Sequence, residues 1–234
     1  MCTLSYLPLD NGFFLVNNRD ESPLRAATLQ PQIREIDGKK ILCPVDTAGN
    51  GTWIGANESG RIACLMNGAF RAHIRRSQYR MSRGKITLGF LSAGDAEDYF
   101  NGIGLDSIEP FTIIIIEPDT IRVFRWNEID KYREYPDSSK AHNWSAPALY
   151  SAETVNDRQK FFYDHTGLFK TDKGKLVDWH MDRLPDSPPL LLHHPLVKTI
   201  SVTTIECQAG GLLMTYEDLL AGSHHIRSLP LISA

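Results

Sequence analysis

The sequence predicts an α+β fold in which two antiparallel sheets pack face to face and helices cover the outside. Strand-like segments come in pairs joined by short turns such as Asp10-Asn11-Gly12, which is typical of hairpins rather than of alternating strands and helices. Two segments, Ile62–Met66 and Phe111–Ile116, are apolar throughout, as expected for strands covered on both faces. Helix-like segments are confined to 82–103 and 151–166. We therefore expect outer helical layers on a single domain spanning residues 1–234.

The first hairpin carries the clearest signals. An Asn-Gly turn at 11–12 separates two runs of strand-forming residues. Antiparallel pairing would bring the end of the second strand, Asn17–Glu21, back beside the start of the first. The thiol of Cys2, the guanidinium of Arg19 and the carboxylate of Asp20 would then lie within reach of one another. We expect Arg19 to face Cys2 and to pair with Asp20, because a lone buried charge is costly.

The remaining strands are predicted from apolar and β-branched runs between turn-forming residues. They are Ile33–Ile36, Lys40–Cys43, Thr52–Asn57, Arg61–Asn67, Phe111–Ile116, Thr120–Trp126, Lys131–Tyr135, His142–Ser145, Thr199–Ile205, Leu212–Tyr216 and Ile226–Leu231. The stretches 24–32 and 44–51 are predicted to be loops, and the polar stretch that includes Lys175–Met181 has no clear pattern.

Three helices are predicted from capping residues and apolar spacing. Ser82 is a suitable N-cap for a helix that ends near Leu91, and a second short helix is expected over 95–103. Ser151 begins the best helical pattern of the chain, which runs to Thr166.

Composition narrows the class of protein. Of 234 residues, 42% are hydrophobic and 23% charged, which predicts an ordered globular chain. A net charge of −3 gives no reason to expect nucleic acid or an anionic membrane as a partner. The longest apolar runs are too short to span a bilayer. The N-terminus lacks the pattern of a signal peptide, so we expect a cytoplasmic protein. The oligomeric state is open, and a homo-oligomer is compatible with the sequence.

Cys2 adds a chemical possibility. Once Met1 is removed, this residue carries a thiol and an α-amine whose pKa of about 7.7–8.0 suits a general base. The thiolate could attack a carbonyl carbon to give a thioester that water later resolves. Arg19 could hold the thiolate or a substrate carboxylate, and Asp20 could orient the amine. Taken alone, Cys2 is better explained as a small residue of the first strand, but the charged cluster on the same hairpin favours the catalytic interpretation.

Met1-Cys2, the hairpin and Asn18-Arg19-Asp20-Glu21 resemble the NRDE family, the transport and Golgi organisation group named for that tetrapeptide. More distantly, the chain is similar to the choloylglycine-hydrolase and penicillin-V-acylase branch of the N-terminal nucleophile hydrolases. The resemblance continues, more weakly towards the end, through Gly51–Asn57, Gly60–Ala63, Leu65–Asn67, Trp144–Tyr150 and Lys198–Ile205. It implies a four-layer α-β-β-α sandwich and a Cys2-dependent amidohydrolase that cleaves a non-peptide C–N bond of a small acyl amide without a cofactor or metal.

The resemblance also implies roles for further residues. Asn67 ends an apolar strand just before Gly68, and the related acylases use an Asn there to stabilise the oxyanion; the alternative is an ordinary turn Asn. Asn18, Ser145 and Lys198 are predicted substrate contacts. The acylases have a second Asn near Ser145 and a late Arg at the position of Lys198, so both are departures from the pattern. Asn143 is expected on the opposite strand face from Ser145.

Other reactive or charged residues are assigned simpler roles. Cys43, Cys64 and Cys207 lie in strand-like surroundings and are interpreted as unreactive thiols, and the scattered histidines lack metal-ligand spacing. The basic stretch 69–80 could recognise an anionic substrate, although a charge run is more often a solvated face.

Two further functions stay open besides the amidohydrolase. The same fold could serve as a carrier or chaperone for haem or a lipid-like ligand, or as a decayed enzyme that acts as a scaffold. Hydrolysis requires a free Cys2 amine, whereas a carrier requires only the pocket.

Overall fold

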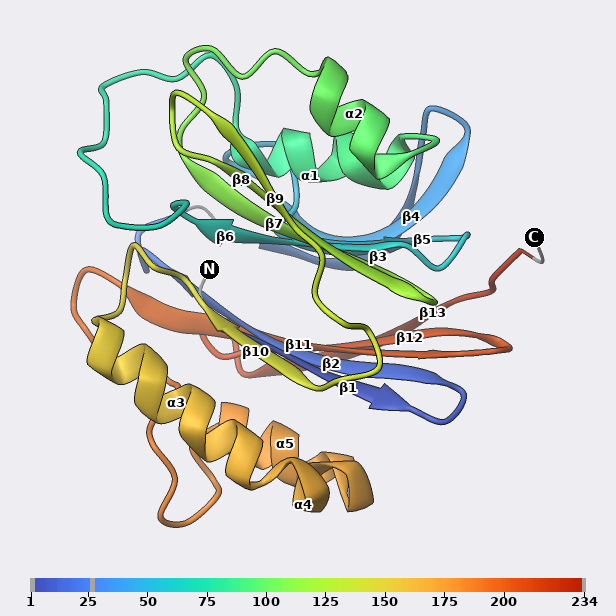
Figure 1. Cartoon of the computed structure of the whole chain (residues 1–234), viewed down its shortest axis with the longest axis vertical. Coiled ribbons are helices and arrows are strands. Elements are labelled where there is room, and N and C mark those ends of the chain that lie inside the picture. The colour runs from blue at the N-terminus through green and yellow to red at the C-terminus, as the bar shows by residue number, and fades with distance from the viewer. Residues whose placement is uncertain (1–2, 26–27, 233–234) are drawn as a thin grey trace.

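The chain folds into four layers, with two central sheets between two layers of helices (Figure 1). The structure is a computed structural model and describes residues 3–25 and 28–232. Within them, sheet A contains β1 (Thr3–Leu9), β2 (Gly12–Glu21), β10 (His142–Ser145), β11 (Lys198–Gln208), β12 (Gly211–Asp218) and β13 (Ser223–Leu229). Sheet B contains β3 (Thr28–Ile36), β4 (Lys39–Asp46), β5 (Ile54–Asn57), β6 (Ile62–Asn67), β7 (Phe111–Glu117), β8 (Thr120–Trp126) and β9 (Lys131–Glu134).

The strand order differs between the two sheets. Sheet A has the order β10-β1-β2-β11-β12-β13, which mixes the two ends of the chain, and sheet B runs from β3 to β9 in strict chain order. All the strand pairs described are antiparallel. The predicted architecture of two stacked antiparallel sheets is therefore confirmed.

Two helices cover sheet B and three cover sheet A (Figure 1). The first pair is α1 (Arg83–Ser92) and α2 (Ala96–Gly102), and the second group is α3 (Ala152–Asp164), α4 (Thr166–Thr171) and α5 (Lys173–His180). The Ser82 and Ser151 side chains accept hydrogen bonds from Gly84 N and Thr154 N, so both predicted N-caps are confirmed. None of the helices within residues 3–25 and 28–232 is long and apolar enough to cross a membrane.

The first hairpin pairs as predicted. Thr3 lies opposite Asn18 and Leu9 opposite Gly12, so the end of β2 returns to the start of β1. Gly12 has a φ of 135°, and a Cβ added there would lie 1.9 Å from the carbonyl oxygen of Cys207. Only glycine fits this turn, which fixes the register of the whole hairpin.

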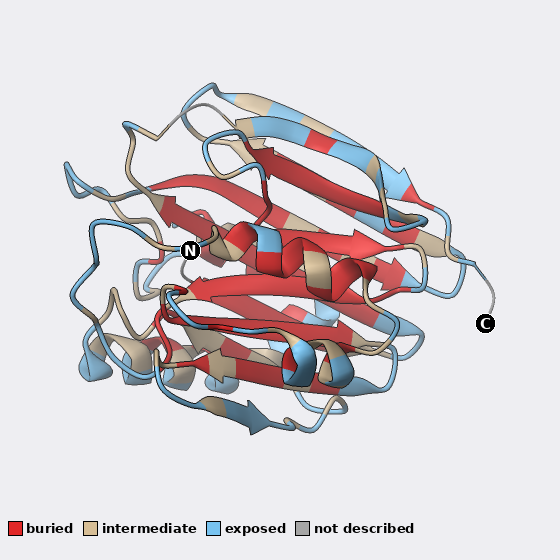
Figure 2. Ribbon diagram, turned by 90° about the horizontal axis from the view of Figure 1, so that it is seen from above, coloured by how far each residue is buried: buried red, intermediate tan, exposed pale blue. Residues whose placement is uncertain are grey.

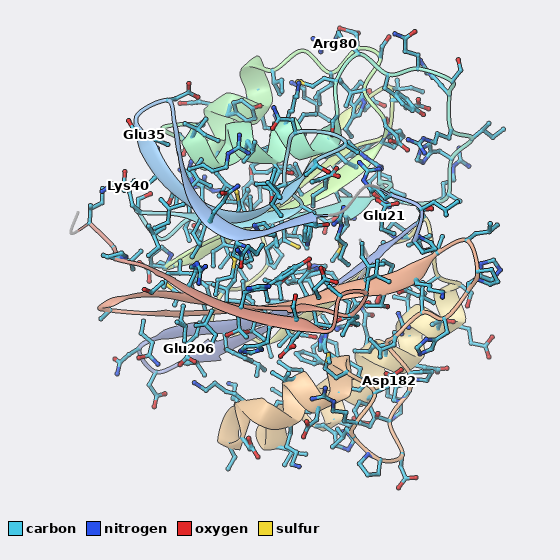
Figure 3. All side chains as sticks on the ribbon, turned by 180° about the vertical axis from the view of Figure 1, so that it is seen from behind. Glu21, Glu35, Lys40, Arg80, Asp182 and Glu206 are labelled. Carbon is cyan, nitrogen blue, oxygen red and sulfur yellow. The ribbon has the colours of Figure 1, made fainter. Side chains whose placement is uncertain are left out.

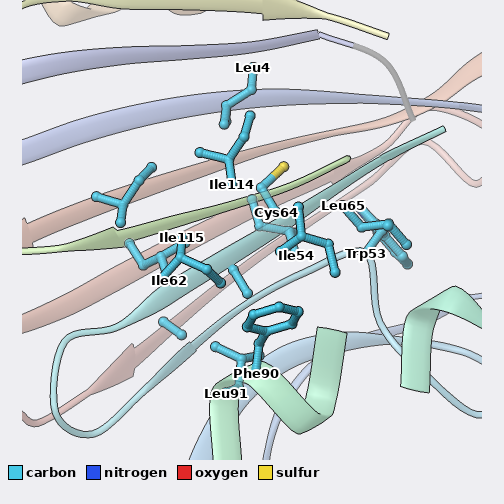
Figure 4. Close-up of a cluster of buried hydrophobic side chains, with 14 of the residues drawn as sticks. Leu4, Trp53, Ile54, Ile62, Cys64, Leu65, Phe90, Leu91, Ile114 and Ile115 are labelled. Carbon is cyan, nitrogen blue, oxygen red and sulfur yellow. The ribbon is translucent and has the colours of Figure 1, made fainter. Parts of the chain in front are cut away.

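Strand alternation divides the buried side chains between two cores. One core fills the space between the sheets and extends under α1, and Figure 4 shows Leu4 of sheet A meeting Ile114 of sheet B, with Phe90 from α1 on the far side. The second core lies between sheet A and α3–α5, where Val16 meets Phe162 and Trp179. Figure 2 shows the buried residues concentrated in the central strands and the exposed ones at the periphery. Both faces of sheet A are thus covered, as its apolar strands require.

Most element boundaries shift by a few residues from the sequence prediction, and the differences discussed next lie in β3, β4 and the α4–α5 segment. β3 begins at Thr28 inside the predicted loop, because it is a largely exposed edge strand with a bulge and a proline, and so lacks the alternation of a half-buried strand. β4 continues past Pro44 to Asp46, which the prediction placed in a loop. α4 and α5 fall in the stretch without a clear pattern, where single buried residues such as Phe169 and Trp179 stabilise very short helices.

Candidate active site

The Asn17–Glu21 cluster lies on β2, where alternation sends its side chains to opposite faces of sheet A. Arg19 points between the sheets and stacks on Trp53, which precedes β5 of sheet B. Asn18 and Asp20 point to the other face, where they contact His180 of α5 and Tyr150 after β10. Asn18, Arg19 and Asp20 are all buried.

Arg19 is held in place from three directions. Its guanidinium lies 3.8 Å from the centre of the Trp53 ring, Nη1 donates to Thr28 Oγ1 (2.5 Å), and Nη2 is 3.7 Å from Asp46 Oδ1. Burial lowers the pKa of Arg19, and the charge of Asp46 opposes that shift. The Nε–H is buried and has no hydrogen-bond partner among the described residues. The side chain therefore has a fixed position and a buried Nε–H that the described residues leave unused.

The carboxylate partner of Arg19 is Asp46 and not Asp20, so the expected ion pair within the cluster is wrong. Neighbouring residues of a strand point to opposite faces, which keeps the Arg19 and Asp20 side chains apart. Asp46 is also bound by Arg25, through Nε to Oδ1 (3.0 Å) and Nη2 to Oδ2 (2.5 Å). Burial acts to raise the pKa of Asp46, but the hydrogen bonds and charge of Arg25, with the charge of Arg19, bring it below its ordinary value.

Asp20 connects three segments of the chain on the helix-covered face of sheet A. Its Oδ2 accepts a hydrogen bond from the Tyr150 hydroxyl (2.6 Å) and its Oδ1 accepts one from Thr199 Oγ1 (2.5 Å). Thr199 Oγ1 in turn accepts from Leu192 N (2.8 Å). Asp20 thereby joins β2 to β11 and to the segment that follows β10.

Asn67 lies at the end of β6, as predicted, opposite Phe111 of β7. It lines a cavity of about 400 Å³ that Arg19, Asp46 and Trp53 also line. It also lines a smaller cavity of about 170 Å³ that reaches Ala148 and Leu149. Its Oδ1 is buried without a hydrogen-bond partner among the described residues. The structure therefore brings Arg19 and Asn67 to one cavity.

The cavity wall depends on a close contact between α1 and the segment before β5. A Cβ added to Gly51 would lie 2.4 Å from the carbonyl carbon of Gly84, and Thr52 N donates to Gly84 O (3.2 Å). Ser82 and Gly84 line the cavity beside Thr52. The glycines thus let the N-terminus of α1 reach the cavity wall.

Cys2 lies outside the described residues, and so does the expected contact between Cys2 and Arg19. Thr3, which follows it in the sequence, pairs with Asn18 of β2 and Ser145 of β10. Cys43, Cys64 and Cys207 are buried. Burial raises the pKa of Cys43 to about 11 and that of Cys64 to about 12, so these two thiols are protonated at neutral pH.

The three predicted substrate contacts do not belong to the lining of the 400 Å³ cavity. Asn18 is fully buried, with its side-chain Nδ2 and Oδ1 both bonded to His180. Ser145 pairs with Thr3, and its Oγ is buried without a partner among the described residues. Lys198 is exposed opposite Glu21. None of the three is among the residues lining that cavity. Asn18 is therefore tied to α5 in this structure, and the substrate roles of Asn18, Ser145 and Lys198 stay predictions.

His180 was not foreseen in the sequence, because α5 has too little pattern to be recognised. Asn18 Oδ1 can only accept, so His180 Nδ1 donates to it (2.6 Å) and Nε2 accepts from Ser5 Oγ (2.7 Å). Asn143 Nδ2 donates to the same Ser5 oxygen (3.0 Å). Burial, aided by the charge of Arg158, lowers the pKa of His180 to about 3, so the ring is neutral. Asn143 and Ser145 are two residues apart on β10 and share a face, so their expected separation was wrong.

The other residues missed by sequence analysis are Asp46, Trp53 and Thr28, which hold Arg19. Asp46 directly follows an apolar run and Trp53 lies in the Gly51–Asn57 segment, so both positions could be noted in the sequence. Nothing in the sequence indicates that both contact Arg19. Within residues 3–25 and 28–232, no group of three or more His, Cys, Asp and Glu side chains could hold a metal ion.

Comparison with known proteins identifies the family. Residues 1–167 match the family described as Transport and Golgi organisation 2. The chain belongs to this family. The resemblance seen in the NRDE tetrapeptide is therefore confirmed, and the region that matches the family model is more than half of the chain. No curated protein sequence matches it significantly.

Solved structures show the same fold at low sequence identity. A variant of conjugated bile acid hydrolase from Clostridium perfringens has a TM-score of 0.56 and 10% identity, covering 100% of this chain and 99% of that one. A second variant of that hydrolase has a TM-score of 0.54 and 10% identity, covering 99% of this chain and 97% of that one. The Caenorhabditis elegans ortholog of N-acylethanolamine-hydrolyzing acid amidase has a TM-score of 0.56 and 12% identity, covering 87% of this chain and 92% of that one. This member of the Transport and Golgi organisation 2 family thus has the N-terminal nucleophile hydrolase fold.

Proposed function

We propose that this protein is an N-terminal cysteine amidohydrolase that cleaves the C–N bond of a small acyl amide. The observation that carries the proposal is the cavity shared by Arg19 and Asn67, on the side of sheet A where Thr3 pairs with Asn18. A cation and a carboxamide at one cavity can assist a nucleophile and a developing oxyanion. Cys2 immediately precedes Thr3 in the sequence.

The reaction has two halves. After removal of Met1, the α-amine of Cys2 takes the thiol proton and the sulfur attacks the substrate carbonyl carbon. Asn67 Nδ2 donates to the oxygen that becomes negative. The C–N bond then breaks, the amine leaves with the proton held by the α-ammonium group, and a thioester remains on Cys2. Water attacks the thioester with the α-amine as base, which releases the carboxylic acid and restores the thiol.

Arg19 and Asp20 support this chemistry in different ways. Arg19 places a fixed positive charge at the cavity, which would favour a thiolate over a thiol. Asp20, on the opposite face of β2, holds β11 and Tyr150 against the strand end through hydrogen bonds from Thr199 and Tyr150. We therefore treat Asp20 as a positioning residue.

Thiol labelling and adduct formation test the proposal together. The intact mass must first be measured to select protein from which Met1 has been removed, because a retained Met1 leaves Cys2 without a free α-amine. Limited iodoacetamide should then label Cys2 before Cys43 or Cys64, and acyl p-nitroanilides should leave an acyl group on Cys2. Cys2→Ala should abolish hydrolysis and the adduct, and Cys2→Ser should lower activity, because the amine deprotonates a hydroxyl less readily than a thiol.

Two results would count against the hydrolase. One is a Cys2 that reacts no faster than Cys64 in the Met1-processed protein, together with no acyl adduct. The other is ligand binding that persists in Cys2→Ala while wild type never forms an adduct, which is the behaviour of a carrier for haem or a lipid-like ligand.

A further inference from the structure

The 400 Å³ cavity has an excess of positive charge. Its lining includes five arginines and three carboxylates, although the chain as a whole has a net charge of −3. These charged residues are Arg19, Arg25, Arg75, Arg76, Arg83, Glu21, Asp46 and Glu109. Figure 3 shows Glu21 between the two sheets, on the side of the molecule from which the 68–82 loop extends. A cavity with more cations than carboxylates favours an anionic ligand.

Three of the arginines are bound by carboxylates or carbonyl groups of the protein itself. Arg19 and Arg25 share Asp46, as described above. The side chain of Arg83 is mostly buried and donates Nη1 to Pro110 O (2.9 Å), with Nη2 3.1 Å from Glu109 Oε2. These interactions build the floor and walls of the cavity.

Arg75 and Arg76 differ from these three. Their side chains are 73% and 53% exposed. Arg75 Nε has only a long contact, 3.8 Å, with Glu109, and this carboxylate already serves Arg83 and His73. Arg76 Nε is 3.0 Å from Glu128 Oε1. Each guanidinium has further donors that could bind an oxyanion in a planar, two-point arrangement.

The basic loop is not uniformly a solvated face. Arg75, Arg76, Ser77 and Tyr79 line the cavity. Arg71, in the same loop, lines a different depression. The charges of the loop are therefore divided between the cavity and the rest of the surface, which the charge run alone did not reveal.

Two further features favour an anion at the same place. The N-terminus of α1, a helix of 10 residues, reaches the cavity through Ser82 and Gly84, and helix N-termini attract negative charge. Arg19, only 2% exposed, also lines the cavity and has an Nε–H without a partner among the described residues. The helix end contributes positive potential, and Arg19 contributes a positive charge and a hydrogen-bond donor.

We propose that the substrate carries an oxyanion, a carboxylate or a phosphate-type group, away from the bond that is cleaved, and that Arg75, Arg76 and the N-terminus of α1 bind it. This inference rests on the proposed function, because it assigns the substrate class of the same cavity. It makes the 68–82 loop the part of the protein that selects substrates by charge.

Binding to the Cys2→Ala protein tests the charge requirement without depending on catalysis. The acyl-side probes are the p-nitroanilides of succinate, glutarate and adipate, the phosphonate analogue of the glutaryl compound, and uncharged pentanoyl p-nitroanilide. N-pentanoylglycine and its uncharged primary amide test a charge on the amine side. Isothermal titration at low salt should show at least one charged probe binding about tenfold or more tightly than its neutral partner.

Loop variants locate the site. The double variant Arg75→Gln/Arg76→Gln should lose that preference, and each single variant should weaken it. Arg71→Gln, which like each single variant removes one positive charge of the loop but outside the cavity, should retain the preference. Salt at 1 M should also reduce the preference, since the screening length is then about 3 Å. Both side chains are largely exposed, so the double variant should remain folded, and its urea unfolding curve checks this.

The outcomes separate this inference from the hydrolase proposal. Equal affinity for charged and neutral probes in every set, no binding by any charged probe, or an Arg71→Gln loss as large as that of the double variant would overturn the anion site. Hydrolysis of pentanoyl p-nitroanilide without charge preference would leave the hydrolase standing and remove the anion site. Charge-selective binding without any acyl adduct on wild-type Cys2 would support the anion site and count against the hydrolase proposal.

Discussion

Replacing Asp46 with Asn removes the carboxylate that lies beside both Arg19 and Arg25 without changing the size of the side chain. Arg19 is 2% exposed, so its charge would then be buried beside a neutral amide. Breaking one half of a buried ion pair costs about 3–5 kcal/mol. The lower value applies, because Arg25 is 27% exposed and water screens its share. We expect Asp46→Asn to lower the free energy of unfolding by about 3 kcal/mol.

Urea unfolding and thermal melts measure this loss. For a chain of this size each kcal/mol shifts the midpoint by about 2–4 °C, so Tm should fall by about 6–12 °C. Asp37→Asn, a change at an exposed turn, is the matched control and should alter stability by less than about 0.5 kcal/mol. Arg19→Leu/Asp46→Asn should recover part of the loss, because it removes the stranded charge as well.

Acid provides a second test of the same pair. The folded pKa of Asp46 is below its ordinary 3.8, so its contribution is present above that pH and is lost as pH falls through the lowered value. The stability gap between wild type and Asp46→Asn should be constant near neutral pH and close below about pH 4. A difference in unfolding free energy smaller than about 0.5 kcal/mol at pH 7, or a difference that does not change as the pH is lowered, would refute the assignment of Asp46 as the partner of Arg19.

Arg19→Lys keeps the charge but loses the planar group stacked on the indole, so alkylation of Cys2 should slow by several-fold while the fold survives; an unchanged rate removes Arg19 from the mechanism. His180 has a pKa of about 3 in the folded protein against an ordinary 6.5, so unfolding takes up a proton between these values and stability falls as pH decreases from 6.5. His180→Gln should flatten that part of a pH series of urea midpoints, and an unchanged slope would contradict a neutral buried ring. Gly51→Ala forces a methyl group against Gly84 and should cost about 1–3 kcal/mol in unfolding experiments; a neutral effect would show that α1 can move.

The sequence predicted the parts of the site that depend on a single strand. Arg19 and Asn67 were both recognised because each stands where a strand with a clear apolar pattern ends, and the structure brings both to one cavity. The hairpin register was predictable for the same reason, since a turn and an alternating pattern are local properties.

The partners of these residues were not predictable, because they are chosen by packing between the sheets. The alternation rule alone is enough to separate Arg19 from Asp20, but it cannot show that Asp46 lies opposite. His180 was missed because α5 is eight residues long and is held by a few buried side chains rather than by a repeating pattern. The contact between Asn18 and that helix was missed for the same reason.

The order of strands in the two sheets also bears on how the protein is made. Sheet B is contiguous in the chain, from residue 28 to residue 134, so its hairpins can form while later residues are still being synthesised. Sheet A joins β1 and β2 to β11, and its links to the candidate site, Asn18 with His180 and Asp20 with Thr199, span 162 and 179 residues. Contacts between distant residues form late, because a long loop must first be closed. The strand that carries the NRDE tetrapeptide therefore waits for the C-terminal third of the chain, and a ribosome-bound fragment contains the motif without the site.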